Sequence, residues 1–428
     1  MVIIEGFKAA KSALSGRALM GEGLDAGERE QVVRRIIEEV RSRGDAALLD
    51  YTLKFDGVKL TSLEVTKGQI ASAYREVNAE VVSALKLAAG RIRSFYTAQK
   101  KEFLGGVTKS GSGQLIRPLG RVGVYAPGGT ASYPSTVLMT AIPAKVAGVK
   151  EVILVTPPGL NGTVSPPTLV AADIARVDRV FSIGGAQAIA ALAFGTGSVP
   201  KVDKICGPGN IFVVLAKKMV YGVVDIDGLQ GPSEVLIIAD GTANPEYCAA
   251  DLLAQAEHDS LASAILITTS RELADKVNRG IEQQMKDLPR QSIATESLNS
   301  RGKIIVVNDV DEAIELANLY APEHLCLMVD RAASYLDRVS NAGCIFIGGN
   351  STVVLGDYVA GPSHVLPTEG AARFSSPLNV IDFIKLMNLV NMDRADLNRL
   401  GRAAATIARA EGFEAHARAV EKRLKVER

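Results

Sequence analysis

Hydrophobic positions follow two different periods along this chain of 428 residues. Apolar side chains recur at helical spacing among charged ones over 31–43 and 79–101, which predicts a helical stretch from Asp25 to about Glu102. From Arg121 onward, short β-branched runs alternate with helical segments. Such alternation predicts βαβ crossovers and therefore a parallel sheet.

The alternating part divides into two α/β units with a boundary near Gln230. The strands expected in the first unit are Val122–Tyr125, Glu151–Val155, Arg179–Ser182 and Val223–Ile226, with helices near Thr136–Ala147, Pro167–Ile174 and Gln187–Phe194. The strands expected in the second are Val235–Ile238, Ala264–Thr268, Ile304–Val307, Leu325–Met328 and Cys344–Ile347, with helices near Pro245–His258, Arg271–Met285, Val310–Leu319 and Arg331–Val339. A hairpin is predicted over 108–116, and a charged, mostly helical tail from Asn379, ending in a helix over 402–426.

Charge and composition narrow the class of protein. Lys and Arg (48) almost balance Asp and Glu (47), without a basic stripe, so neither nucleic acid nor an anionic membrane is an expected partner. The chain shows no run of about 20 apolar residues and no signal peptide, and we expect a cytoplasmic protein. Its four cysteines lack C-x-x-C spacing and are read as reduced. Cys206 and Cys326 adjoin suggestive motifs, but their apolar neighbours favour buried, inert thiols.

The chain has only four histidines, and three of them follow or adjoin a carboxylate. On the helix predicted over 251–259, Gln255 and His258 are three residues apart, so an amide and an imidazole project from one face and could share a metal ion. Alternatively, Asp251, Gln255 and Asp259 form the solvated face of an amphipathic helix.

Two further stretches carry candidate chemistry. Glu323-His324 stands at the foot of a predicted strand, where the imidazole could take a proton and the carboxylate could activate water; a solvated corner is the alternative. Asp357 and His364 lie in a long connecting stretch, and Asp357 is either a ligand or a turn former. Gln255, His258, Asp357 and a further histidine would form an O/N ligand set suited to zinc.

Three glycine-bearing turns follow predicted strands or open helices. They are Tyr125–Gly129, Gly184–Gln187 and Gly207–Asn210, and none is a complete G-x-G-x-x-G or Walker loop. Each could present backbone N–H groups to phosphate at a helix N-terminus, or be an ordinary βα turn. Three such turns at the carboxyl end of one sheet favour a cofactor site.

Taken in order, these motifs resemble the histidinol dehydrogenase family over nearly the whole chain. The matching segments are Gly123–Gly129, Gly184–Gln187, Gly207–Asn210, Gly231–Glu234, Asp251–His258, Ala321–Leu325, Gly356–Thr368, Phe374–Pro377 and Glu411–His416. The resemblance implies a zinc-dependent, NAD-linked oxidation of L-histidinol to L-histidine through the aldehyde. It also implies an α/β fold with two Rossmann-like domains and helical N- and C-terminal segments in an intertwined homodimer.

The resemblance also assigns roles to particular residues. It implies zinc ligands Gln255, His258, Asp357 and His416; catalytic residues Glu323 and His324; NAD contacts Tyr125, Gln187 and Asn210; and substrate contacts Ser233, Gln255, His258, His324, Asp357, Glu411 and His416. His324 would be the acid/base and Glu323 would activate water, while Glu411 and His416 would reach the site of the partner subunit. His364 is included as a neighbour of the site.

The expected domains are an N-terminal segment (1–20), a first Rossmann-like domain (21–120 with 231–378), a second, NAD-binding one (121–230) and a tail (379–428). Phe212, Ser363 and Cys326 depart from the family pattern, where Tyr, Asn and an acidic residue are common. Because Ser363 adjoins the expected substrate pocket, a paralogue that oxidises another small polar alcohol, such as a sulfonated diol, is the alternative. A zinc hydrolase and a catalytically silent metal-binding protein are further alternatives.

Overall fold

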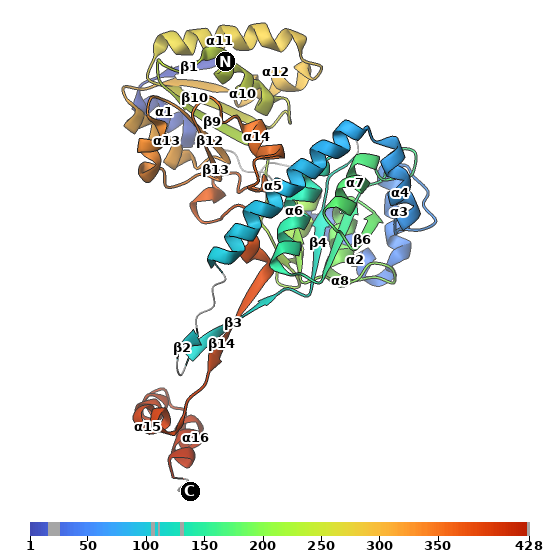
Figure 1. Cartoon of the computed structure of the whole chain (residues 1–428), viewed down its shortest axis with the longest axis vertical. Helices are drawn as coiled ribbons and strands as arrows, with labels where there is room; N and C mark the ends of the chain where they lie inside the picture. The colour runs from blue at the N-terminus through green and yellow to red at the C-terminus, as the bar shows by residue number, and fades with distance from the viewer. Residues whose placement is uncertain (16–25, 104–107, 110–111, 129–131, 426–428) are drawn as a thin grey trace.

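Two parallel sheets organise the chain (Figure 1). The computed structural model describes residues 1–15, 26–103, 108–109, 112–128 and 132–425. Its six-stranded sheet has the order β1-β11-β10-β9-β12-β13 and its five-stranded sheet the order β6-β5-β4-β7-β8. Every pairing in these two sheets is parallel, as predicted from the alternating pattern.

The strands of the six-stranded sheet are β1 (Val2–Glu5), β9 (Glu234–Ala239), β10 (Ser263–Thr268), β11 (Lys303–Val306), β12 (His324–Met328) and β13 (Cys344–Ile347). Those of the five-stranded sheet are β4 (Arg121–Tyr125), β5 (Glu151–Thr156), β6 (Arg179–Ser182), β7 (Lys204–Cys206) and β8 (Asp225–Ile226). A separate antiparallel ribbon joins β2 (Thr108–Lys109), β3 (Ser112–Pro118) and β14 (Ile384–Val390), which confirms the hairpin predicted over 108–116.

The helices before β9 are α1 (Phe7–Ser15), α2 (Ala26–Arg43), α3 (Asp45–Asp56), α4 (Lys67–Glu76), α5 (Ala79–Phe103), α6 (Pro134–Ala147), α7 (Pro166–Ile174), α8 (Gly185–Phe194) and α9 (Ile211–Val220). Those after it are α10 (Pro245–Ala256), α11 (Arg271–Gln284), α12 (Gln291–Ser300), α13 (Val310–Tyr320), α14 (Val353–Tyr358), α15 (Arg394–Ala410) and α16 (Glu414–Leu424). Short 3₁₀ turns are η1 (Met285–Asp287), η2 (Ala332–Arg338), η3 (Ala371–Arg373) and η4 (Val380–Phe383).

Both parallel sheets are buried on both faces, which explains their nearly continuous apolar strands. In β5, Leu154 packs into one core and its neighbours Ile153 and Val155 into another. In β9, Val235 and Leu236 likewise face opposite cores. Alternate side chains thus point to helices on opposite sides of each sheet, the arrangement of an α/β unit with a parallel sheet.

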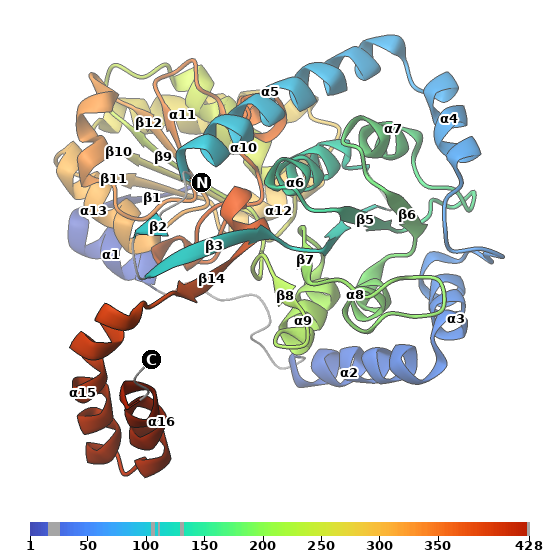
Figure 2. The same ribbon diagram turned by 60° about the horizontal axis from the view of Figure 1, so that its bottom comes forward.

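The predicted assignment of residues 21–120 to the same domain as 231–378 is wrong for the helices in it. Helix α2 packs on α8 and α9, α4 on α7, and α5 on α6 and α7, all around the five-stranded sheet. The reason is visible in α2, where Val33 and Ile37 enter the same core as Ile189 of α8. In contrast, β1 and α1 from the predicted N-terminal segment join the six-stranded sheet (Figure 2).

Several predicted elements also change at their ends. Strand β7 was not predicted, β8 is shorter than the expected Val223–Ile226, and η2 replaces the helix expected near Arg331–Val339. The tail helix expected over 402–426 is two helices, because Gly412 has a positive φ of 82° and the chain turns there. Residue 426 lies outside the described residues.

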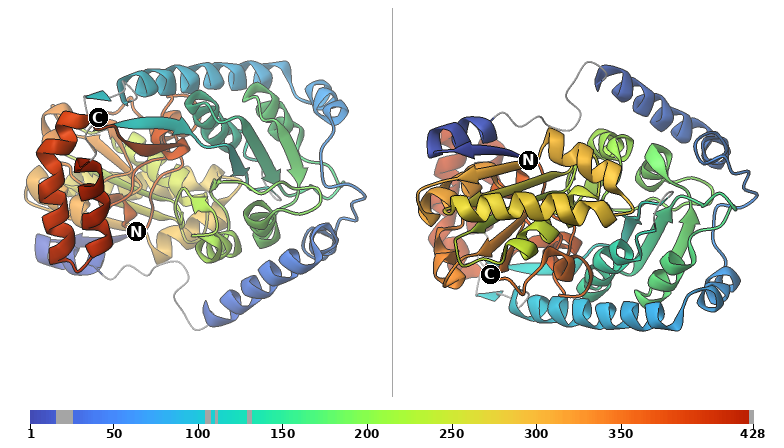
Figure 3. Two further views of the ribbon diagram at one scale, coloured as in Figure 1. Left: turned by 90° about the horizontal axis from the view of Figure 1, so that it is seen from below. Right: turned by 90° about the horizontal axis from the view of Figure 1, so that it is seen from above.

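Helices α15 and α16 pack on each other beyond the end of β14, apart from both sheets (Figures 1 and 2). Seen along the long axis of the molecule, the two sheet domains lie side by side, with α5 running along both (Figure 3). Within the described residues, no helix is both long and apolar enough to cross a membrane.

Candidate active site

The predicted acid–base pair stands at the amino edge of the six-stranded sheet. His324 is the first residue of β12, between Val235 of β9 and Cys344 of β13. Helix α13 ends at Tyr320, and its C-cap Ala321 adopts a left-handed φ of 52° that turns the chain into this strand. Glu323 and His324 are only 5% and 3% exposed, so the alternative of a solvated corner is wrong.

The main chain of Glu234 holds both members of the pair. Its N–H donates to Glu323 Oε2 (2.8 Å), and its carbonyl oxygen lies 2.9 Å from His324 Nδ1. A carbonyl can only accept, so Nδ1 carries a proton and Nε2 of the neutral ring keeps its lone pair. His324 Nε2 is buried and has no hydrogen-bond partner in the described part of the chain. The ring is therefore fixed as a base aimed away from the sheet.

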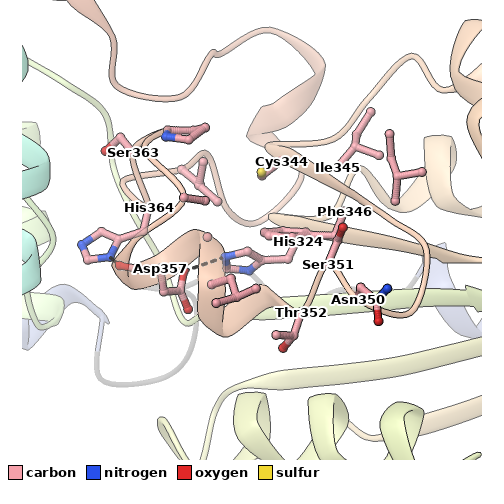
Figure 4. A pocket seen from close by; sticks show the side chains of 16 residues that line it. His324, Cys344, Ile345, Phe346, Asn350, Ser351, Thr352, Asp357, Ser363 and His364 are labelled. Atoms are coloured by element: carbon pink, nitrogen blue, oxygen red, sulfur yellow. Dashed lines mark hydrogen bonds and ion pairs between the residues drawn. The ribbon is translucent and has the colours of Figure 1, made fainter. Parts of the chain in front are cut away.

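Asp357 lies opposite that nitrogen (Figure 4). Its Oδ1 is 3.5 Å from His324 Nε2. His364 fixes the turn at Asp357, because its Nδ1–H donates to the Asp357 carbonyl oxygen (2.9 Å) and its Nε2 lies 3.2 Å from Thr136 Oγ1. Asp357 belongs to the short helix α14, so the prediction that it lies in a connecting stretch without regular structure is wrong. His364 thus positions a neighbour from the edge of the site.

The charges around Asp357 compensate one another. Burial raises the pKa of the Asp357 carboxyl, but the imidazoles of His324, His364 and His258 outweigh it and hold the pKa below its usual range. For His324, burial lowers the pKa, and the carboxylates of Glu323 and Asp357 raise it above the ordinary value. The carboxylate is therefore the favoured form of Asp357 in this cluster.

Gln255 and His258 lie at the carboxyl end of α10. The helix ends at Ala256, two residues before the predicted end, and the His258 N–H donates to the Gln255 carbonyl (3.2 Å). The solvated face proposed as an alternative is wrong, because Asp251 and Gln255 are 8% and 4% exposed and Thr352 donates to Asp251 (2.7 Å). Gln255 Nε2 is buried and unpaired within the described residues. The amide is thus available to a ligand.

Two cavities meet at this cluster. One of about 310 Å³ is lined by His324, Asp357, Ser363 and His364 (Figure 4). The other, of about 580 Å³, lies between the domains; its lining includes α5, the start of α6 with Tyr133 and Ser135, and His258, Arg290 and Tyr358. Arg290 belongs to no motif of the sequence, and Tyr358 was given no role although it lies in the matching segment Gly356–Thr368. The site thus opens toward the five-stranded sheet.

Ser233 and Ser363 occupy different surroundings. Ser233 directly precedes Glu234, and its carbonyl accepts from the Ser263 N–H (3.0 Å), which places it beside the acid–base pair. Ser363 is buried, with its N–H bound to Tyr96 Oη (2.9 Å) and its Oγ accepting from the Val365 N–H (3.0 Å). Ser363 therefore serves the turn before His364 through bonds within its own chain.

The two tail residues assigned to the site, Glu411 and His416, lie elsewhere in this chain. Both are exposed, at the junction of α15 and α16, and the His416 ring stacks on Phe413 (centroids 5.0 Å apart). Within the described residues, no three His, Cys, Asp or Glu side chains gather as a metal site. Gln255, His258 and Asp357 would need another donor to complete a four-ligand shell.

The three residues assigned to NAD lie at the carboxyl edge of the five-stranded sheet. Tyr125 ends β4 and its Oη accepts from the Gly185 N–H (3.1 Å), while Gln187 lies in the first turn of α8. Asn210 caps α9 by accepting from Phe212 and Val213 N–H (3.0 and 3.2 Å). Gly129 of the predicted first turn lies outside the described residues. Strands β4 and β7 are neighbours from which the chain continues in opposite directions, so this edge is a topological switch point.

A buried ion pair that was not predicted from the sequence holds the turn after β7. Asp227 Oδ2 accepts from the Gly207 N–H (2.7 Å), and Lys217 Nζ donates to the Gly207 carbonyl (3.1 Å) and to Asp227 Oδ1 (2.5 Å). Both side chains are 1% exposed. At Gly207 the φ is 114°, and a Cβ would meet the Tyr125 carbonyl oxygen at 2.1 Å.

This architecture defines a two-domain α/β protein with a buried Glu–His pair at the edge of one sheet and glycine-bearing turns at the edge of the other. Comparison with known proteins gives the family: a sequence model of histidinol dehydrogenases matches residues 21–424. The chain belongs to the histidinol dehydrogenase family of oxidoreductases.

Its relatives match over nearly their whole length. The chain is 59% identical to a histidinol dehydrogenase of Dehalococcoides mccartyi (strain CBDB1), over 99% of this chain and 100% of the relative, and 53% identical to one of Deinococcus radiodurans (92% and 91%). The crystal structure of histidinol dehydrogenase from Elizabethkingia anophelis superposes with a TM-score of 0.92 at 38% identity, covering 99% and 97% of the chains. These matches confirm the family predicted from the motifs and the mixed α/β fold.

Proposed function

We propose that the chain oxidises L-histidinol to L-histidine, through L-histidinaldehyde, with zinc and NAD, in histidine biosynthesis. Family membership supports the reaction class. The observation that carries the proposal within this chain is the fixed tautomer of His324, whose buried Nε2 is free to take a proton. An oxidoreductase family leaves the zinc hydrolase alternative without support.

The donor set fits zinc. The amide of Gln255, the imidazole of His258 and the carboxylate of Asp357 are oxygen and nitrogen ligands of the kind that zinc accepts. Gln255 Nε2 is buried without a partner among the described residues, and rotating the amide by half a turn would place its oxygen at the same position. Gln255 and His258 also lie at the carboxyl end of α10, where the helix dipole favours a cation. Gln255, His258 and Asp357 would hold the metal with His416 of a second copy, as the resemblance implies.

The turns at the other sheet fit NAD. Gly185 and Gly207 bring main chain close to Tyr125, and helices α8 and α9 point their N-termini to the same edge. Gln187 Oε1 is buried and lacks a partner among the residues described. When bound, zinc would position and polarise the substrate, and NAD would accept one hydride in each of the two oxidations.

The residues of this chain then have separate tasks. His324 Nε2 takes the proton of the substrate hydroxyl as hydride leaves the carbon that bears this hydroxyl for NAD, which gives the aldehyde. Glu323, oriented by the Glu234 N–H, takes a proton from water as that water adds to the aldehyde. Loss of a second hydride from the hydrate gives the acid, so one alcohol, one water and two oxidised cofactors would yield one carboxylate, two reduced cofactors and three protons. The buried thiols of Cys206 and Cys326 have pKa values raised by burial and take no part.

A second copy of the chain supplies the tail residues in this proposal. Strand β14 exposes Leu386, Met387, Leu389 and Val390, and the helical pair beyond it stands apart from both sheets (Figure 1). Apolar side chains on a projecting ribbon gain most from burial against another subunit. A homodimer that exchanges tails would bring Glu411 and His416 to the neighbour's cluster.

The direct test mixes zinc-loaded protein, NAD and L-histidinol and follows absorbance of NADH and formation of L-histidine. Two NADH per L-histidine, lost on chelation of zinc and restored by zinc, is the expected result. A panel with other small polar alcohols, sulfonated diols included, tests the paralogue alternative. NADH from another alcohol but none from L-histidinol would contradict the proposed substrate.

A further inference from the structure

Four buried polar atoms in the five-stranded-sheet domain have no hydrogen-bond partner in the described part of the chain. They belong to α3, the end of β6 and α8, and are Thr52 Oγ1, Asp56 Oδ2, Ser182 Oγ and Gln187 Oε1. Thr52 and Asp56 are one helical turn apart on α3, which packs on α8, the helix of Gln187. Buried polar atoms are nearly always paired in folded proteins, so unpaired ones in one region indicate a missing ligand.

The chain path places Asp56 at the carboxyl edge of the five-stranded sheet. Just after it, Val58 lies against the loop that follows β5, where a Cβ on Gly162 would be 3.3 Å from Val58 Cγ1. The chain then reaches the end of β6, where the Ser182 N–H donates to the Leu63 carbonyl (2.7 Å). Residues 56–63 therefore cross the ends of β5 and β6, the edge that carries the NAD turns.

Asp56 also shares a face with the assigned NAD residues. Tyr51 of α3, Tyr125 of β4 and Ala186 of α8 belong to one core. Burial, with the nearby Asp56 charge as a smaller cause, raises the pKa of the Tyr125 hydroxyl to about 12. In Figure 2, α3 lies beside α8 at the side of this domain away from β12 and α10. A dinucleotide with its nicotinamide near His324 would therefore extend its adenosine toward Asp56.

We propose that Asp56 accepts hydrogen bonds from the 2′- and 3′-hydroxyls of the adenosine ribose and so makes the enzyme select NAD against NADP. Two hydroxyls would supply the donors that the buried Oδ2 of Asp56 lacks among the described residues, whereas a 2′-phosphate would bring like charge to the same place. Burial raises the pKa of Asp56 to about 6, because a carboxylate withdrawn from water holds its proton more tightly. This inference rests on the proposed use of NAD.

The test compares Asp56→Asn and Asp56→Ser with the wild type in zinc-loaded enzyme. Dissociation constants for NADH and NADPH come from cofactor fluorescence, and kcat and KM are measured with NAD and NADP. We expect Asp56→Asn to weaken NADH binding about tenfold or more and to lower the NAD-to-NADP preference in kcat/KM by at least as much. With NAD at saturation, kcat should stay within about twofold. Asp56→Ser, which leaves room for a phosphate, should lower the preference further.

Asp50→Asn is the matched control, since Asp50 lies on the same helix but is exposed and paired with Arg43. Asp50→Asn should leave the dissociation constants for NADH and NADPH and the NAD-to-NADP preference in kcat/KM unchanged. An unchanged cofactor preference in both Asp56 variants, or an equal loss for the two cofactors, would overturn the ribose contact while leaving NAD-linked oxidation standing. A wild type that reduces neither cofactor with L-histidinol would instead remove the proposed function, and this inference with it.

Discussion

The two parallel sheets differ in which end of their strands faces the candidate site. The five-stranded sheet presents its carboxyl edge, where α8 and α9 begin, and the six-stranded sheet presents its amino edge, where β12 begins and α10 ends. Helix N-termini favour anions and helix C-termini favour cations. The difference teaches that one edge is suited to a dinucleotide phosphate and the other to a metal ion and a proton-transferring base.

The two edges also shift the pKa of a carboxyl group in opposite directions. At the amino edge, Asp357 is surrounded by imidazoles that lower the pKa of its carboxyl. At the carboxyl edge, burial raises the pKa of Asp56 to about 6. One carboxylate is stabilised within this chain, and the other lacks a donor for its buried oxygen among the described residues. Variants at each edge should therefore change different quantities.

The largest expected effect is at the amino edge. Glu323→Gln should slow oxidation of L-histidinaldehyde by about 100-fold or more and the first oxidation much less, because only the second needs an activated water. Single-turnover rates with the alcohol and with the aldehyde measure this difference. Glu315→Gln, an exposed residue of α13 paired with Lys11, is the control. Equal slowing of both steps would remove the water-activating role.

A smaller effect is expected at the carboxyl edge. Lys217→Met removes a donor from the Gly207 turn and should raise KM for NAD about tenfold, with kcat changed less than about twofold. Lys218→Met, an exposed neighbour paired with Glu30, should change neither constant. Because an unpaired Asp227 would destabilise the fold, Lys217→Met/Asp227→Asn provides a second, uncharged variant. A fall in kcat at unchanged KM would contradict this division between the edges.

The smallest effect concerns stability and pH. The pKa of Asp56 is about 6 in the folded chain and about 4 when unfolded, so the folded state binds the proton more tightly and loses stability as pH rises between these values. Asp56→Asn should therefore gain about 1 kcal/mol in unfolding free energy between pH 4.5 and pH 8, after discounting for the half-exposed carboxyl. Urea unfolding at both pH values measures the gain. If the stability of Asp56→Asn relative to the wild type fell as the pH rose, this prediction would be contradicted.

Much of the fold followed from the sequence because the strands are apolar on both faces and the turns between them are rich in glycine. Strand β7 escaped prediction because Lys204-Ile-Cys206 is too short to show a period. The grouping of the N-terminal helices failed for another reason. Amphipathic periodicity shows that α2 has an apolar face, but not which sheet that face covers.

The candidate site was predictable in its residues and not in its geometry. Rare histidines beside carboxylates drew attention to Glu323, His324 and Asp357, but the sequence could not show that one residue, Glu234, orients both members of the pair. Asp56 and the ion pair of Lys217 with Asp227 belong to no motif. Their neighbours are set by tertiary packing, which a local pattern does not contain.

The central claim is that each site combines two edges of one chain with the tail of another. It is tested most directly by mixing His324→Ala and His416→Ala proteins, re-pairing their subunits, and measuring NADH formation. Each variant alone should be nearly inactive. Random re-pairing makes half of the dimers heterodimers with one intact site of two, so about a quarter of wild-type activity should return. No recovery in heterodimers confirmed by native mass spectrometry would contradict the shared site.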